Sequence, residues 1–218
     1  MIIEKLRTGC KRLSLDLEEK QLLALETYVD CVLDFNKTYN LMKAENADEM
    51  AVNHLLDSLA ALPHIQALDL KKTSLGDIGS GGGCPGIPLA VALPDFKVTL
   101  VERMEKRCDF LKNTLNCMNL QNVEVLCAQA DSVLPHQFDV AVFRAFHPFD
   151  KKIGKTLLRL LKQNGYLVAY KARSEKIQQE MSTPEVKSLF PQYKKIPLTV
   201  PFLEDHERNL VVIQVSST

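Results

Sequence analysis

The chain has 218 residues, of which 46% are hydrophobic and 25% charged, a composition typical of a soluble globular protein with a sizeable core. Lys plus Arg and Asp plus Glu both number 27, so no basic field covers the whole protein, and contact with nucleic acid must come from local patches. The sequence has neither an apolar run long enough to span a membrane nor an N-terminal signal core, and we expect a cytoplasmic protein.

The N-terminal part of the chain is predicted to form a helical extension. Apolar residues recur at helical spacing over residues 16–35, and Asp16 followed by Glu19 indicates a capping box at the start of that helix. A second helix is expected over residues 51–62, ended by Pro63. The expected division of the chain is into this extension, residues 1–70, and a main domain, residues 71–218.

Beyond residue 73, candidate strands alternate with candidate helices, a pattern typical of a parallel sheet with helices on both faces. The expected strands are residues 74–78, 97–101, 123–127, 138–143 and 166–170. The expected helices are residues 85–93, 104–118, 149–161 and 174–190. Two strand-like runs, 194–200 and 209–215, follow with no helix between them, and a hairpin there would add an antiparallel strand to the sheet. We therefore expect an α/β fold with a mostly parallel, seven-stranded sheet.

A glycine-rich segment joins the first expected strand to the next helix and reads Asp77-Ile-Gly-Ser-Gly-Gly-Gly-Cys-Pro-Gly-Ile-Pro-Leu89. Glycines let the backbone adopt positive φ and let a ligand approach, and the helix N-terminus adds the positive end of a dipole. Asp77 stands two positions before the first glycine, and a carboxylate there suits a cationic ligand such as S-adenosylmethionine better than a pyrophosphate. A Walker loop is excluded, because no Gly-Lys-Ser/Thr follows.

Acidic residues stand at the ends of the next two expected strands. Glu102 ends the second, where a carboxylate can accept both ribose hydroxyls of an adenosine, in NAD or in S-adenosylmethionine alike. Ala130 and Asp131 follow the third, where an acid can bind the adenine amino group and a small residue leaves room for the ring. A role for Asp131 as a helix N-cap stays open. With the glycine loop, these residues predict an adenosine-containing cofactor.

The fourth expected strand is followed by Phe143-Arg144-Ala145-Phe146-His147-Pro148, which lacks the features of two methyltransferase classes. An Asp/Asn-Pro-Pro-aromatic motif, used to methylate exocyclic amines, is absent, and so is the nucleophilic cysteine of cytosine-C5 enzymes. A ring nitrogen with a free lone pair, such as guanine N7, needs neither, because in-line positioning and desolvation suffice. His147 is a lesser candidate for a general base, since attack by N7 releases no proton.

The glycine segment closely resembles the Asp-x-Gly-Thr/Ser-Gly-x-Gly-x-Pro-Gly-Ile-Pro-Leu loop of the bacterial small-subunit ribosomal RNA guanine-N7 methyltransferases, with both prolines in place. Further matches are Asn36-x-x-x-Asn40-Leu41, His54-x-x-Asp57-Ser58-Leu59, Lys106-Arg107-x-x-Phe110-Leu111 and Arg144-Ala145. The resemblance extends over residues 30–175. It implies a class I S-adenosylmethionine-dependent methyltransferase fold, Rossmann-like, and transfer of a methyl group to N7 of a specific guanine in 16S ribosomal RNA.

The resemblance also implies roles for individual residues. Gly79 and Cys84 would line the cofactor pocket through their backbone, Ala130 and Asp131 would contact adenine, and Arg144 would border both cofactor and substrate as a positioning residue. The complete set of expected cofactor-binding residues is Asp77, Gly79, Gly81, Cys84, Glu102, Ala130, Asp131 and Arg144. One departure concerns the substrate side, because Lys171-Ala172 replaces the family's Lys-Gly and adds a side chain where RNA is expected to enter.

The expected partner is small-subunit ribosomal RNA or a ribosomal particle, bound by a monomer. RNA contacts are expected from Lys171, Arg173 and Arg208, the first two because they follow the fifth strand at the edge where open α/β sheets bind ligands. No metal site is expected, because no cysteines form a Cys-x-x-Cys pair and the histidines are scattered. Two alternatives stay open: an NAD-binding oxidoreductase, disfavoured by Asp77, and a catalytically silent ribosome-assembly factor with the same fold.

Overall fold

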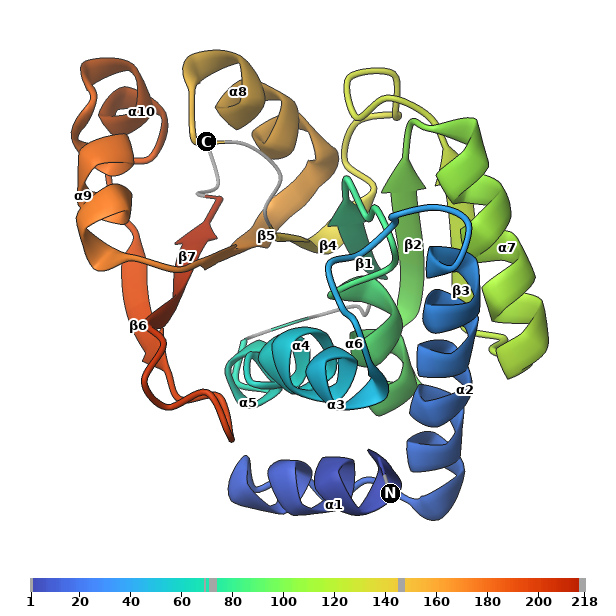
Figure 1. The fold of residues 1–218 in the computed structure, drawn as a ribbon. Coiled ribbons are helices and arrows are strands. Elements are labelled where there is room, and N and C mark those ends of the chain that lie inside the picture. The colour runs from blue at the N-terminus through green and yellow to red at the C-terminus, as the bar shows by residue number, and fades with distance from the viewer. Residues whose placement is uncertain (1, 69, 71–73, 145–147, 216–218) are drawn as a thin grey trace.

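The computed structural model describes residues 2–68, 70, 74–144 and 148–215. Their centre is a seven-stranded sheet of order β3-β2-β1-β4-β5-β7-β6, with helices on both faces (Figure 1). The strands are β1 (Ser74–Ile78), β2 (Lys97–Glu102), β3 (Val123–Cys127), β4 (Phe138–Arg144), β5 (Leu161–Lys171), β6 (Lys194–Leu198) and β7 (Arg208–Gln214). Strands β1 to β5 pair in parallel, and β7 runs antiparallel to both β5 and β6. The predicted sheet and its antiparallel strand are confirmed.

Three helices of the main domain agree with the prediction: α6 (Gly86–Ala92), α7 (Glu105–Met118) and α8 (Lys151–Leu160). The single helix predicted over residues 174–190 is wrong, because two helices occupy this segment, α9 (Ser174–Ser182) and α10 (Pro184–Leu189). Pro184 disfavours helical backbone at the residue before it but suits the first turn of a helix, so it divides the segment. Strand β5 also begins earlier than predicted, directly after α8.

The N-terminal helices are α1 (Ile2–Arg12), α2 (Glu19–Asn36), α3 (Ala47–Met50), the π-helix η1 (Ala51–Leu56), α4 (Asp57–Leu59) and α5 (Leu62–Gln66). Two predictions in this region are wrong. The capping box of α2 joins Glu18 to Gln21 rather than Asp16 to Glu19, because α2 begins at Glu19 and its cap is the residue before it. Pro63 lies in the first turn of α5 instead of ending a helix, at a position where its missing N–H is not needed.

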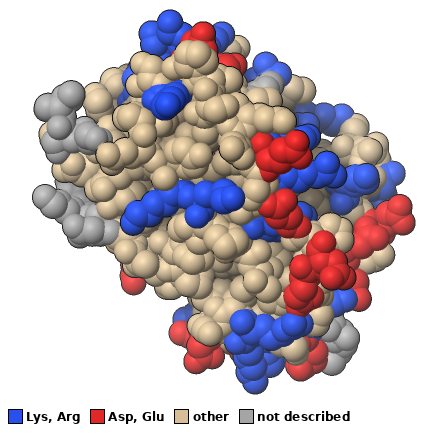
Figure 2. Space-filling view, turned by 90° about the vertical axis from the view of Figure 1, so that its left-hand side faces the viewer, with Lys and Arg blue, Asp and Glu red and all other residues tan. Residues whose placement is uncertain are grey.

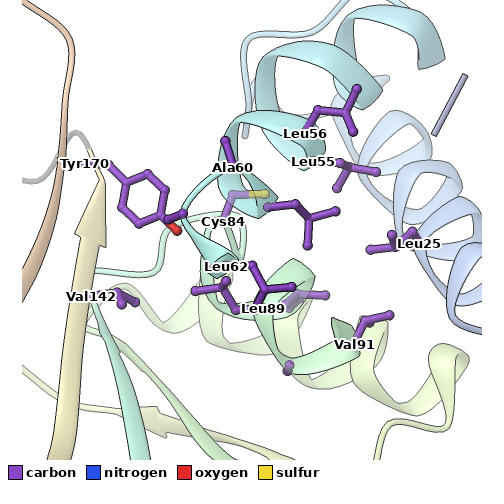
Figure 3. Packing of buried hydrophobic residues seen from close by; sticks show 14 of the residues in the cluster. Leu25, Leu55, Leu56, Ala60, Leu62, Cys84, Leu89, Val91, Val142 and Tyr170 are labelled. Atoms are coloured by element: carbon purple, nitrogen blue, oxygen red, sulfur yellow. The ribbon is translucent and has the colours of Figure 1, made fainter. Parts of the chain in front are cut away.

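The N-terminal helices pack against the main domain through one continuous apolar cluster. Figure 3 shows Leu25 of α2, Leu55 of η1 and Leu62 of α5 directed toward Leu89 of α6, and these leucines are almost completely buried. Burying one such side chain contributes about 1.5–3 kcal/mol to stability. A second cluster lies on the other face of the sheet, beneath α8, α9 and α10. The helices before β1 are therefore held firmly beside the sheet edge that carries the predicted site.

Candidate functional site

The glycine loop after β1 has a backbone that demands glycine at several positions. Gly79, Gly81 and Gly83 adopt φ values of 75°, 60° and 105°, in the left-handed region that side chains disfavour. A Cβ atom on Gly82 would lie 2.4 Å from Sδ of Met42, in the segment between α2 and α3. The loop is therefore shaped both by its own conformation and by close contact with the segment between α2 and α3.

Asp77, near the end of β1, is buried and holds this loop in place. Its Oδ2 accepts hydrogen bonds from Oγ of Ser80 at 2.8 Å and from the backbone N–H of Gly86 at 2.9 Å. Its Oδ1 is also buried and has no hydrogen-bond partner among the described residues. Burial raises the pKa of this carboxyl to about 6. A buried acceptor without a donor fits a ligand that brings N–H groups or positive charge.

Glu102, at the end of β2, is buried and connects the glycine loop to α7. Its Oε2 accepts a hydrogen bond from the N–H of Gly81 at 2.9 Å. Its Oε1 accepts from the N–H groups of Arg103 and Met104, at 2.9 and 2.8 Å, just before α7 begins. A carboxylate has about four acceptor positions. Glu102 can therefore keep these three bonds and still accept one from a ligand.

A pocket of about 310 Å³ opens beside Glu102, and we call it the β1–β3 pocket. It brings together four of the predicted cofactor-binding residues: Gly79, Glu102, Ala130 and Asp131. Apolar walls come from Val101 and Leu157. Residues 128–137 contain no helix, so the alternative role of Asp131 as an N-cap is wrong. Small apolar and acidic residues together suit a flat ring with polar edges.

A second pocket of about 510 Å³, the β4–β7 pocket, lies at the ends of β4 and β5 and the start of β7. It includes Arg144 and two of the residues predicted to contact RNA, Lys171 and Arg208. Asn53, His54 and Asp57 of the N-terminal helices complete its wall. Three predicted residues, Asp77, Gly81 and Cys84, are not among the described residues that line either pocket.

Arg144 is fixed in the β4–β7 pocket by three groups from the N-terminal helices. Its Nη1 donates to Oδ2 of Asp57 at 2.9 Å and to the backbone carbonyl of Asn53 at 3.1 Å. Its Nη2 lies 2.8 Å from Nδ1 of His54, and Nε2 of that histidine lies 3.1 Å from the carbonyl of Lys43. These contacts assign a neutral His54 that accepts at Nδ1 and donates at Nε2. Burial, and then Arg144, lower the pKa of His54, in agreement with that assignment.

Asp57 and His54 are site residues that were not predicted. Asp57 also accepts a hydrogen bond at Oδ1 from Nε of Arg208, at 2.8 Å, so it bridges two arginines. The available signal was the segment His54-x-x-Asp57, whose spacing of three residues places both side chains on one side of a helical turn. Residues 51–56 form a π-helix, a form often found at functional sites, which apolar periodicity does not reveal.

The other residues predicted to contact RNA have different environments. Nζ of Lys171 forms an ion pair with Glu180 at 2.6 Å and lies 4.7 Å from the ring centroid of Phe149. Arg173 precedes α9 and is not among the residues that line the β4–β7 pocket. Figure 2 shows Lys and Arg in separate groups with Asp and Glu between them, in agreement with the neutral total charge. Ala145 and His147 lie outside the described residues.

Tyr28 of α2 joins the N-terminal helices to the glycine loop. Its buried hydroxyl donates to the carbonyl of Gly82 at 2.7 Å and lies 3.3 Å from Sγ of Cys84. Replacing Tyr28 by phenylalanine leaves that carbonyl buried without this donor, so we expect the free energy of unfolding to fall by about 1–3 kcal/mol. Urea unfolding of both proteins measures the change. An unchanged unfolding midpoint would contradict a stabilising role for the bond.

Two structural features limit the chemistry of the site. Among the described residues, no group of three or more His, Cys, Asp or Glu side chains is arranged to hold a metal ion. Within the same part of the chain, no helix has the length and apolar character needed to cross a membrane. The polar side chains that line the two pockets include carboxylates, guanidinium and ammonium groups, amides and the imidazole of His54.

Comparison with known proteins adds an independent observation. Residues 21–211 match the family described as rRNA small subunit methyltransferase G. A protein named ribosomal RNA small subunit methyltransferase G in Treponema denticola is 35% identical, over 94% of this chain and 92% of that protein. The protein of the same name in Neisseria meningitidis serogroup B is 39% identical, over 77% and 79%. A solved SAM-dependent methyltransferase from Aquifex aeolicus has the same fold, with a TM-score of 0.54 and 16% identity over 73% of this chain and 93% of that one.

Proposed function

The chain belongs to the rRNA small subunit methyltransferase G family, and we propose that it transfers a methyl group from S-adenosylmethionine to N7 of a specific guanine in 16S ribosomal RNA. The observation that carries this proposal is the family match over residues 21–211. Two pockets at the carboxyl edge of the sheet support it. Ligands bind at that edge in open α/β sheets. One pocket suits the cofactor, and the other suits the base.

The residues predicted for the cofactor support binding of S-adenosylmethionine. Oδ1 of Asp77 is a buried acceptor without a partner, which an ammonium or sulfonium group would compensate. Glu102 and Asp131 offer carboxylates to ribose and adenine, and Ala130 leaves space for the ring. The backbone shape of the glycine loop after β1 depends on Gly79, Gly81 and Cys84. The bound cofactor supplies a methyl group activated by its sulfonium leaving group.

The chain's own contribution to the reaction is orientation. The N7 lone pair of guanine attacks without losing a proton, so the site needs no general base and forms no covalent intermediate with the enzyme. Arg144, which lines the β4–β7 pocket, is the positioning residue. Asp57, His54 and the Asn53 carbonyl hold its guanidinium on one side, which fixes the remaining edge relative to the substrate.

Calorimetric titration tests the cofactor assignment. We expect S-adenosylmethionine to bind with a stoichiometry of one, and NAD to show no binding at the same concentration. The pyrophosphate of NAD would bring negative charge close to Asp77, which disfavours it. Tight binding of NAD in the absence of any binding of S-adenosylmethionine would end the proposal and favour an oxidoreductase.

The affinity for S-adenosylmethionine is expected to depend on pH through Asp77. Its pKa is about 6 in the free protein, so the carboxyl is mostly neutral at pH 5 and mostly ionised at pH 7. A cationic ligand favours the ionised form, so affinity should rise as pH rises through 6, by about tenfold from pH 5 to pH 7. Titrations at several pH values measure this rise. Asp77→Asn should flatten it, and a rise of the same size in that variant would contradict the role of Asp77.

Several finer assignments belong to the same proposal. We place the protein in the cytoplasm and regard small-subunit ribosomal RNA or a ribosomal particle as its partner. We regard the protein as a monomer, with residues 1–70 as an extension of a methyltransferase domain at residues 71–218. Lys171, Arg173 and Arg208 remain the proposed RNA contacts. Arg208 is the one for which the surrounding geometry supports a more specific role.

A further inference from the structure

Asp57 is a buried carboxylate that binds two arginines from different strands. Only 4% of the residue is exposed. Its Oδ2 accepts from Nη1 of Arg144 at 2.9 Å, and its Oδ1 accepts from Nε of Arg208 at 2.8 Å. The two arginines stand at the end of β4 and the start of β7, which are separated in the sheet by β5. One carboxylate therefore fixes the spacing of two guanidinium groups across the β4–β7 pocket.

The charges in this pocket do not balance. Asp57 supplies one negative charge against the two positive charges of Arg144 and Arg208. His54 is neutral in the tautomer that its contacts assign, and the charge of Lys171 is matched by its ion pair with Glu180. Counted over the described residues that line it together with Glu180, the β4–β7 pocket carries a formal charge of +1, which attracts an anion.

The two arginines differ in their access to solvent. The side chain of Arg144 is 16% exposed and that of Arg208 is 26% exposed, so Arg208 lies nearer the mouth of the pocket. Arg208 uses Nε for Asp57 and Nη1 for the carbonyl of Glu207. Its Nη2 has no hydrogen-bond partner among the described residues. A guanidinium held on one edge and open on another is suited to a phosphate oxygen.

We infer that the β4–β7 pocket contains a phosphate-binding site, in which Arg208 binds one phosphate of the RNA backbone. Asp57 is the positioning residue that holds the guanidinium groups of Arg208 and Arg144 at a fixed spacing. This inference rests on the proposed function. The phosphate beside the target nucleotide would meet Arg208 at the mouth, while the base would reach Arg144 deeper in the pocket. Asp57 thus couples the binding of the backbone to the placement of the base.

The first test compares Arg208→Gln with Lys20→Gln, which removes the same charge from an exposed residue at the start of α2. RNA affinity is measured by filter binding at several salt concentrations. Each phosphate contact contributes about 0.7–0.9 to the slope of log affinity against log salt. Arg208→Gln should lower that slope by about one contact, whereas Lys20→Gln should leave it unchanged. Equal slopes for wild type and Arg208→Gln would overturn the phosphate site.

The second test separates positioning from general stability. Asp57→Asn keeps the shape of the side chain but raises the pocket charge by one, so KM for RNA should stay the same or fall while kcat falls about tenfold. Asp139→Asn is the control, because Asp139 also pairs with a basic side chain, that of Lys162, but lies outside both pockets. That variant should keep the wild-type kcat. An unchanged kcat in Asp57→Asn would overturn the positioning role.

The wild-type protein distinguishes failure of this inference from failure of the proposed function. Both tests begin by measuring methyl transfer and cofactor binding in the wild type. If the wild type neither binds S-adenosylmethionine nor methylates RNA, the proposed function is wrong. If it does both and the Arg208→Gln slope is unchanged, the phosphate site alone is wrong. Should Asp57→Asn fail to fold, the salt slope of Arg208→Gln still decides whether the phosphate site exists.

Discussion

Replacement of Arg144 by alanine is expected to lower kcat for methyl transfer by about 100-fold, the loss that a misplacement of about 1 Å can cause. Arg144 lines the β4–β7 pocket and makes hydrogen bonds to Asp57, His54 and the Asn53 carbonyl. Removing the Arg144 side chain breaks the hydrogen bonds that join the end of β4 to the N-terminal helices in the wall of the β4–β7 pocket. Although Arg144 was among the predicted cofactor-binding residues, it does not line the β1–β3 pocket, where Glu102 and the glycine loop keep their contacts, so cofactor affinity should change little. Methyl transfer from labelled S-adenosylmethionine to RNA measures the rate, and calorimetry measures the affinity.

A second substitution at this position guards against a loss of folding. Truncating Arg144 leaves the buried carboxylate of Asp57 with one partner fewer, which is destabilising. Arg144→Lys keeps the charge but cannot donate to three groups in the same planar geometry. We expect this variant to fold, to bind the cofactor normally and to show a clearly reduced kcat. Wild-type kcat in Arg144→Lys would show that the planar geometry of Arg144 is not needed for the reaction.

Replacement of Glu102 by alanine is expected to weaken the binding of S-adenosylmethionine by about 100-fold. The substitution removes the acceptor for the N–H groups of Gly81, Arg103 and Met104 and the proposed acceptor for ribose. Hydrogen bonds to a charged group contribute about 1.5–3 kcal/mol each, and solvent replaces part of that contribution at the pocket surface. A loss near 2.7 kcal/mol corresponds to a factor of about 100.

The matched control for Glu102 is Glu124→Ala, on the neighbouring strand. Glu124 is exposed and pairs with Thr99 and Lys97, and it does not line the β1–β3 pocket. Its removal should leave cofactor affinity unchanged. Calorimetric titration of the three proteins at one pH gives the comparison. Equal affinities for wild type and Glu102→Ala would exclude Glu102 from the cofactor site.

The parts of the fold and site that follow local rules were predictable from the sequence. Short apolar runs alternating with amphipathic segments predicted the parallel sheet, because a strand and a helix differ in the spacing of their buried side chains. Residues at successive strand ends predicted the β1–β3 pocket, because parallel strands bring their carboxyl ends to one edge. Glu102 and Asp131 lie far apart in the chain, yet both line that pocket.

The β4–β7 pocket was predicted only in part, because its key contacts join distant segments. Asp57 meets Arg144 across 87 positions and Arg208 across 151 positions, and no local pattern encodes such pairs. Tyr28 and Gly82 are joined across 54 positions in the same way. Helix ends were also hard to place, since Asp16 is the better N-cap by residue type, yet α2 begins at Glu19 and has Glu18 as its N-cap.

The most direct test of the central claim is the identity of the methylated nucleoside. The purified protein is incubated with labelled S-adenosylmethionine and either 16S ribosomal RNA or small ribosomal subunits, both from a strain that lacks the gene, and the RNA is digested to nucleosides. We expect the label in 7-methylguanosine alone, and in one fragment of the RNA when it is cleaved at that base. Label in any other nucleoside, or no label with either substrate, would contradict the assignment of a guanine-N7 methyltransferase.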